Sequence, residues 1–129
     1  MENIEKPNKI LLVEDDEDIA LISSRILRDY GGFEVKHAES GIIALEILPI
    51  YKPNLVLMDV MMPGLDGVET LKRIKVIPGY EDIAVIFMTA KSQIHEQELY
   101  MSLGAKGVIL KPFDPTQLCQ EVLNLWKSD

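Results

Sequence analysis

The chain has 129 residues, 47% hydrophobic and 26% charged, which is typical of a single globular domain. Its formal net charge of -8 argues against binding to nucleic acid or to an anionic membrane, because both require a basic surface. No apolar run is long enough to span a bilayer, no signal-peptide core precedes Lys9, and the single Cys119 excludes an internal disulfide. We therefore expect a cytoplasmic protein, with residues 1–8 as a flexible N-terminal segment and 9–127 as one domain.

In the first half of the chain, short apolar runs alternate with segments of helical spacing. The run 10–13 predicts a buried strand, and the stripe over 19–27 predicts a helix. Residues 33–37 alternate apolar and polar side chains, which favours a strand at a sheet edge. A helix is expected over 40–48, with Ser40 as its N-cap and with Pro49 ending or kinking it.

The second half repeats this alternation. Three apolar runs predict strands, and three segments between and after them predict helices. The strands are 55–58, 84–88 and 108–110, and the helices are 68–74, 92–103 with Ser92 as N-cap, and a last helix starting near Pro115. Strict alternation with short connections predicts an α/β fold of three layers, in which five parallel strands form an open, doubly wound sheet.

Ligands of such a sheet bind where the strands end, so the residue after each apolar run is informative. These positions hold acids, a hydroxyl and an amine, namely Glu14, Asp15, Asp59, Thr89 and Lys111. Carboxylates that are brought close together repel one another, and a divalent cation removes that conflict. Hard oxygen ligands favour Mg²⁺, Lys111 and Thr89 could hold phosphoryl oxygens, and one carboxylate could be the nucleophile of aspartyl-phosphate chemistry.

Four segments at these positions carry a family resemblance. They are 13–15 (Val-Glu-Asp), 57–67 (which includes Asp59), 89–90 (Thr-Ala) and 111–113 (Lys-Pro-Phe). Together they resemble the receiver domain of two-component response regulators, over residues 9–126. The resemblance implies a flavodoxin-like strand order 2-1-3-4-5 and a cis peptide before Pro112. Within this family, the chain is similar to the stand-alone receiver domains found in chemotaxis and sporulation.

The resemblance also implies roles for individual residues. Asp59 would accept the phosphoryl group and, with Asp15, bind Mg²⁺ directly. The backbone carbonyl of Met61 would complete the protein ligands, while Glu14 would act through a metal-bound water. Thr89 and Lys111 would contact the phosphoryl group.

The expected phosphate donor is a histidine kinase or a histidine phosphotransfer protein. Output is expected through a protein target that binds the face of the fourth helix, fifth strand and fifth helix. The chain would not be an enzyme, and it would be a monomer or a weak homodimer. Val108 stands where the family often has an aromatic switch residue, so the usual aromatic rearrangement is not expected. Met61 and Lys91 occupy positions that influence the lifetime of the phosphorylated state in this family.

Two other functions remain open at this point. A Mg²⁺-dependent phosphohydrolase could use the same acids, but Met61 stands where such enzymes usually place their general acid. A degenerate receiver could act only as an interaction module, although no site residue is lost here. The chain could also be an excised part of a longer protein. Among the remaining polar residues, Asp16 and Asp66 are interpreted as helix caps, and His37 and His95 as structural or surface residues rather than metal ligands or phosphotransfer groups.

Overall fold

The computed structural model describes residues 6–90 and 93–128, within which strands and helices alternate strictly. The strands are β1 (Lys9–Val13), β2 (Glu34–Ala38), β3 (Leu55–Asp59), β4 (Ala84–Thr89) and β5 (Gly107–Leu110). The helices are α1 (Glu17–Asp29), α2 (Gly41–Tyr51), α3 (Gly67–Lys75), α4 (Ile94–Ser102) and α5 (Leu118–Lys127). None of these helices combines the length and the apolar character that crossing a membrane requires, within the described ranges.

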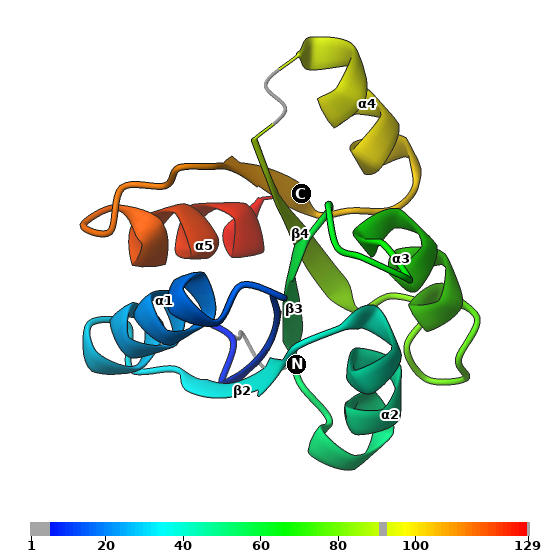
Figure 1. Cartoon of the computed structure of the whole chain (residues 1–129), viewed down its shortest axis with the longest axis horizontal. Coiled ribbons are helices and arrows are strands. Elements are labelled where there is room, and N and C mark those ends of the chain that lie inside the picture. The colour runs from blue at the N-terminus through cyan, green and yellow to red at the C-terminus, as the bar shows by residue number, and fades with distance from the viewer. Residues whose placement is uncertain (1–5, 91–92, 129) are drawn as a thin grey trace.

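The strands pair in parallel in the order β2-β1-β3-β4-β5, which confirms the predicted fold class and strand order. Helices α1 and α5 cover one face of the sheet, and α2, α3 and α4 cover the other (Figure 1). Two apolar layers therefore form, one on each side of the sheet. The central strand β3 is buried along its whole length, as its continuous apolar run predicts.

The edge strand β2 follows its alternating pattern. Glu34 and Lys36 are exposed, while Val35 and Ala38 are buried. Before β1, the described residues Lys6 and Asn8 already contact the domain. The Lys6 ammonium donates a hydrogen bond to the Gly31 carbonyl, and the Asn8 carbonyl accepts one from the Glu34 amide. The proposed domain boundary at residue 8 stays a prediction, and residues 1–5 lie outside the described ranges.

Side-chain caps start three of the helices as the sequence predicts. Asp16 accepts hydrogen bonds from two backbone amides in the first turn of α1. Ser40 caps α2 through the Ile43 amide at 3.1 Å, and Asp66 caps α3 through the Glu69 amide at 2.8 Å. These contacts confirm that Asp16 and Asp66 act as helix caps.

Two predicted helix ends differ from the structure, and a third prediction falls on a residue that is not described. Helix α2 continues through Pro49 to Tyr51, because an exposed proline in the last turn costs only one hydrogen bond of the helix. Helix α5 begins at Leu118 rather than near Pro115, because the preceding residues form a separate turn on Asp114. The predicted N-cap Ser92 lies outside the described residues, and Gln93 takes the N-cap position of α4 without a side-chain hydrogen bond.

Gly67 fixes the start of α3 against the end of β3. A β-carbon at this position would lie 2.5 Å from the Asp59 carbonyl oxygen and 2.8 Å from the Val60 α-carbon. Both atoms belong to the backbone and cannot rotate away. A glycine is therefore required for α3 to approach the strand that carries Asp59.

This contact predicts that Gly67→Ala lowers the free energy of unfolding by about 2–3 kcal/mol, because the overpacked backbone must shift. Gly79 is the matched control, since its φ of +93° disfavours alanine but nothing lies within 4 Å of the added carbon. Gly79→Ala should cost only about 1 kcal/mol, the conformational term alone. Urea denaturation of both variants measures the difference, and equal losses would contradict the packing argument.

Candidate functional site

The strand register brings the predicted site residues to one edge of the sheet. Val13 pairs with Met58, so the residues that follow β1 lie beside Asp59 at the end of β3. Thr89 pairs with Leu110, which places Thr89 next to the start of the segment at Lys111. The Lys111 amide donates a 2.8 Å hydrogen bond to the Thr89 carbonyl. The carboxyl edge of the sheet is therefore where the acids, the hydroxyl and the amine meet.

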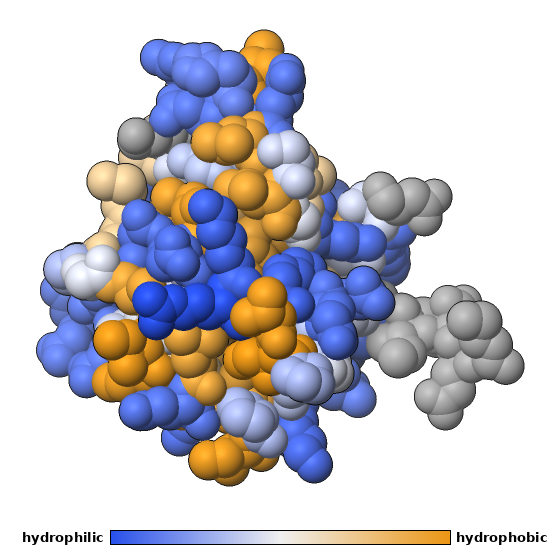
Figure 2. All heavy atoms as spheres, turned by 90° about the vertical axis from the view of Figure 1, so that its right-hand side faces the viewer, coloured by the Kyte–Doolittle hydropathy of each residue, from blue (hydrophilic) through white to orange (hydrophobic). Residues whose placement is uncertain are grey.

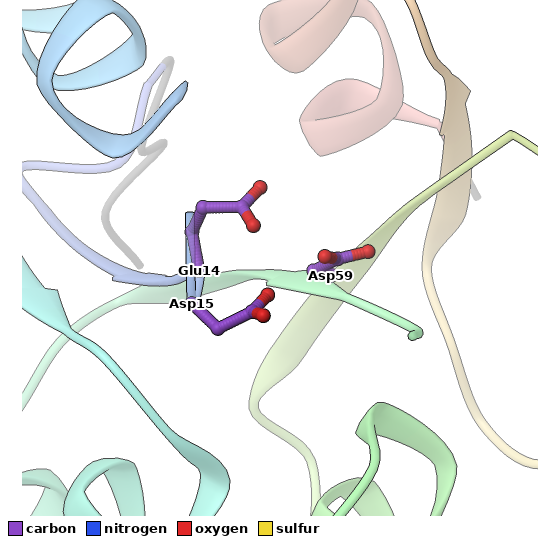
Figure 3. Close-up of side chains that lie close together, drawn as sticks. All are labelled: Glu14, Asp15 and Asp59. Atoms are coloured by element: carbon purple, nitrogen blue, oxygen red, sulfur yellow. The ribbon is translucent and has the colours of Figure 1, made fainter. Parts of the chain in front are cut away.

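Three carboxylates lie together at this edge. Glu14, Asp15 and Asp59 each offer one oxygen, and these oxygens all lie within 4.8 Å of one another. Figure 3 shows Glu14 and Asp15 extending from neighbouring positions of the chain toward Asp59. Glu14 and Asp59 are buried, whereas Asp15 is exposed. The cluster therefore has one side open to solvent, from which a cation or a phosphoryl group can enter.

Lys111 is the positive charge of the site. Its ammonium lies 2.8 Å from Oε1 of Glu14 and 3.2 Å from Oδ2 of Asp59. Burial alone would lower the pKa of Lys111, but the two carboxylates together raise it. The peptide bond from Lys111 to Pro112 is cis, as the family resemblance implies. The lysine is thus held in its charged form between two acids.

The surroundings of Glu14 disfavour the ionised form of its carboxyl group. Burial raises the pKa of its carboxyl to about 7, and the Asp59 carboxylate adds to the shift, while Lys111 opposes it. Its backbone is fixed on both sides, because its amide donates to the Ala38 carbonyl and its own carbonyl accepts from Nε2 of His37 at 2.7 Å. A cation that reaches the site would therefore stabilise the ionised carboxylate of Glu14.

His37 is predicted to be a structural or surface residue, and it contacts the backbone of Glu14. Its imidazole holds the main chain of Glu14 in place through the Glu14 carbonyl, not through a carboxylate of the cluster. No local motif reveals this contact, because it depends on the pairing of Leu12 with His37 across β1 and β2. The signal lies in the sheet register rather than in the sequence near either residue.

The loop after β3 orients the Asp59 carboxylate. Oδ1 of Asp59 accepts a hydrogen bond of 3.3 Å from the Met61 amide. The Val60 amide donates to the Met88 carbonyl, and the Val60 carbonyl accepts from the Gly67 amide. The Met61 side chain is 62% exposed. The backbone of this loop is therefore fixed by hydrogen bonds, whereas the methionine side chain is mostly in contact with solvent.

Several candidate residues lie away from this cluster. Cys119 is half-buried, its thiol donates to the Ile26 carbonyl at 3.5 Å, and burial raises the pKa of that thiol. Tyr100 of α4 is buried, and its ring packs edge-to-face on Phe87 with ring centres 5.3 Å apart. Val108, in register with Phe87, is half-buried at the same layer. The aromatic contact thus belongs to α4 and β4, not to β5.

The donor set of the cluster fits a magnesium ion. Carboxylate oxygens are the hard ligands that Mg²⁺ prefers, and this ion usually keeps several of its waters. Two of the acids are buried, and an exposed third leaves room for such waters. An acidic pocket of this kind could hold a metal, and it is the kind of pocket at which receiver domains bind Mg²⁺.

Comparison with known proteins shows the family. The model of the response regulator receiver domain matches residues 10–123. The chain therefore belongs to the response regulator receiver domain family. It is a receiver domain of two-component signalling, in which response regulators work by phosphorylation.

Two relatives illustrate the range of this family. The chain is 40% identical over 106 residues to sporulation initiation phosphotransferase F of Bacillus subtilis, which is 82% of this chain and 83% of that protein. It is 42% identical over 103 residues to a Vibrio cholerae protein named probable cyclic di-GMP phosphodiesterase, which is 80% of this chain and 23% of that protein. The chain spans about half the length of several other curated relatives that it matches, some of which are named as transcriptional regulators.

A solved structure agrees with the fold. The chemotaxis protein CheY4 of Vibrio cholerae superposes with a TM-score of 0.85 at 27% sequence identity. The match covers 91% of this chain and 97% of that chain. The resemblance to single-domain chemotaxis and sporulation proteins that the sequence predicts is therefore confirmed.

The raised pKa of Glu14 predicts how stability depends on pH in metal-free protein. The folded state holds its proton up to about pH 7, whereas an ordinary glutamate loses it near 4.5. The protonated Glu14 carboxyl therefore contributes to the free energy of unfolding below pH 4.5. This stabilising contribution is lost as the pH rises through 7. We expect a loss on the order of 1–3 kcal/mol between pH 5 and pH 8.

Urea denaturation at several pH values measures this loss. Glu14→Gln removes the titrating group and should flatten the curve between pH 5 and pH 8. Excess Mg²⁺ should flatten the wild-type curve as well, since the ion stabilises the ionised carboxylates. Identical pH dependence in wild type and Glu14→Gln would contradict this account. Lys111 does not affect the pH dependence in this range. Because its pKa is raised, the stability that its ammonium contributes is lost only at alkaline pH.

Proposed function

We propose that the chain is a phosphoacceptor switch in which Asp59 receives a phosphoryl group from a phosphohistidine. The observation that carries this proposal is the position of the Asp59 carboxylate. It is only 6% exposed, lies 3.2 Å from the Lys111 ammonium, and is joined by Glu14 and Asp15. The donor is a histidine kinase or a histidine phosphotransfer protein.

In the transfer, one oxygen of Asp59 forms a bond to phosphorus while the bond from phosphorus to the donor's histidine nitrogen breaks. The carboxylate is held in a fixed orientation, because Oδ1 accepts from the Met61 amide and Oδ2 pairs with Lys111. Lys111 neutralises charge that develops on the phosphoryl oxygens. To do so it exchanges part of its present contact with Glu14 for the incoming group. The buried Thr89 hydroxyl, at the end of β4, binds another phosphoryl oxygen.

The same acids hold Mg²⁺ in this proposal. Asp15 and Asp59 would bind it directly, the backbone carbonyl of Met61 would complete the protein ligands, and Glu14 would act through a bound water. The positive charge held there would offset the crowded carboxylates and the charge of the phosphoryl group. The raised pKa of Glu14 supports the need for such a cation.

An apolar groove beside the site supports docking of the donor. It has a volume of about 390 Å³ and leads directly to the phosphate-binding lysine. Its lining residues are Ile19, Ile22, Ala90, Lys111, Pro112, Phe113 and Pro115. A donor that places its phosphohistidine at Asp59 must cover this groove. We therefore expect apolar residues next to the donor's histidine.

Output is proposed through the face of α4, β5 and α5, which a target protein would bind. Apolar side chains are exposed along this face, with Ile94 at 73%, Leu99 at 53% and Leu110 at 43%. Val108 cannot provide the usual aromatic rearrangement, so the signal would pass through the loop after Thr89 and a shift of α4. An alanine scan of this face that leaves target binding intact would contradict the proposal.

The charge of the domain and the side chain of Met61 also bear on its partners, its location and its catalytic activity. With a net charge of -8, the domain itself is expected to bind neither nucleic acid nor membrane and to work in the cytoplasm as a monomer or weak homodimer. It is expected not to act as an enzyme on small phosphate esters, since Met61 cannot transfer protons. Turnover of such an ester would favour the phosphohydrolase instead. A domain that took up no phosphate would favour the interaction module.

Phosphorylation is tested with acetyl phosphate and Mg²⁺, followed by the mass of the intact protein. We expect one phosphoryl group on the wild type and none on Asp59→Asn. Asp15→Asn should require more Mg²⁺ for the same yield, because it removes a ligand but keeps the acceptor. Chelation of Mg²⁺ should abolish the adduct. An adduct that persists in Asp59→Asn would contradict the assignment of the acceptor.

We infer a long-lived phosphorylated state from Met61, because a bulky side chain two residues after the acceptor can hinder the hydrolytic water. Met61→Ala should shorten the half-life of the phosphorylated protein severalfold, while the rate of phosphoryl transfer to Asp59 stays unchanged. Loss of phosphate with the same rate in wild type and variant would exclude this role. The second position implicated in lifetime, Lys91, lies outside the described residues.

A further inference from the structure

Helix α2 has an unusual composition for a surface helix. Of its 11 residues only Glu46 is charged, yet only Gly41, Ala44 and Leu48 are buried. Helices that are apolar on all sides are normally enclosed by other elements. Here Ile42 is 56% exposed and Ile50 is 83% exposed. The helix therefore presents apolar surface that no described part of the chain covers.

Figure 2 faces α2, α3 and α4 and shows where apolar side chains gather. One group lies over the lower part of this face, where α2 is located, and charged side chains separate it from the apolar side chains near α4. The apolar surface of α2 is thus distinct from the output face proposed above.

A hollow of about 500 Å³ lies at the C-terminal end of α2. Ile47, Ile50 and Tyr51 of the helix line it, together with Lys9 of β1 and Lys36 of β2. The Lys9 ammonium donates to the Tyr51 carbonyl at 3.3 Å and lies 5.2 Å from the centre of the tyrosine ring. The hollow therefore combines an apolar wall with a basic rim.

This rim is basic in a strongly acidic chain. Lys9 and Lys36 line the hollow, and Lys52 directly follows Tyr51. None of the three lysines forms an ion pair with a residue in the described ranges. The acids of this region are Glu34, the register partner of Lys9, and Glu46 of the helix. The three lysines outnumber these two acids, and the side chains of Lys36 and Lys52 are exposed to solvent, where a partner could reach them.

We propose that α2 and this hollow form a docking surface for an acidic, amphipathic segment of a partner protein. An apolar side chain of the partner enters the hollow against Ile47 and Ile50. Carboxylates that flank this side chain pair with Lys9, Lys36 and Lys52.

The charges decide between this occupant and two others. In a symmetric dimer through α2, the lysines of one copy would lie close to those of the other, which opposes self-association. An anionic membrane would attract the rim but would repel the rest of a domain with a net charge of -8. An acidic protein segment meets only the basic rim and the apolar wall, so it fits best.

The surface lies at the opposite edge of the sheet from the phosphorylation site. Lys9 begins β1, whereas Glu14 follows its last residue, Val13. A partner on α2 therefore leaves Asp59 open to its phosphodonor. The inference does not depend on the proposed function, and docking should occur in both the phosphorylated and unphosphorylated states.

The test uses a synthetic amphipathic peptide of about 16 residues, long enough for partial helix formation, with leucine on one face and glutamate on the other. Titration into isotope-labelled protein, followed by NMR, should shift the signals of α2, Lys9 and Lys36. Ile50→Glu and Lys36→Glu should each weaken binding about tenfold, as expected for a central contact. Val76→Glu is the matched control, since Val76 is 78% exposed at the end of α3, and it should bind like the wild type.

Three results would overturn the proposal. One is equal binding of a peptide with lysine in place of glutamate. A second is binding that shifts the groove beside Lys111 instead of α2. The third is association of the protein with itself or with anionic vesicles that Ile50→Glu abolishes, since α2 would then serve another occupant. Phosphorylation by acetyl phosphate should be unchanged in every variant, which separates this test from that of Asp59.

Discussion

The contact of the Lys111 ammonium with Glu14 and Asp59 is the interaction on which the rest of the site depends. Two buried carboxylates and an exposed third lie within 4.8 Å of one another, an arrangement that is unfavourable without a cation. Lys111 opposes the rise in the pKa of Glu14, but burial and the Asp59 carboxylate still raise that pKa to about 7. The site therefore favours additional positive charge, which Mg²⁺ would supply, and the Lys111 ammonium already lies beside the proposed acceptor Asp59.

The fold brings the three carboxylates together at one end of the strands and leaves the other end separate from them. Parallel strands deliver the acids to one edge of the sheet, and the close approach of Gly67 holds the end of β3 in place. The opposite edge is free for a different task, since the basic hollow beside α2 lies where β1 begins. The proposed chemistry and the proposed docking would thus use opposite ends of the same strands. The buried Tyr100, packed on Phe87, explains how α4 can be held against β4 when Val108 supplies no aromatic ring.

Much of the fold follows from the sequence, because short continuous apolar runs rich in β-branched residues favour strands buried on both faces of a parallel sheet. The same reasoning predicts that Asp59, Thr89 and Lys111 meet, since each follows such a run. Features that depend on distant neighbours do not follow. The contact of His37 with the Glu14 carbonyl requires the register of β1 and β2, and the burial of Tyr100 requires the packing of α4. The continuation of α2 past Pro49 also differs from the simple rule that proline ends a helix, because this proline is exposed and lies in the last turn, where it costs only one hydrogen bond.

The central claim is that Asp59 and Lys111, with Mg²⁺, form one phosphoryl-binding site. Beryllofluoride, which imitates a phosphoryl group on a carboxylate, tests it most directly when its binding is followed by NMR of the labelled protein. The account predicts that beryllofluoride binds only with Mg²⁺, shifts the signals of Asp59, Thr89 and Lys111 together, and has no effect on Asp59→Asn. Binding without Mg²⁺, or shifts that leave Thr89 and Lys111 unchanged, would contradict it.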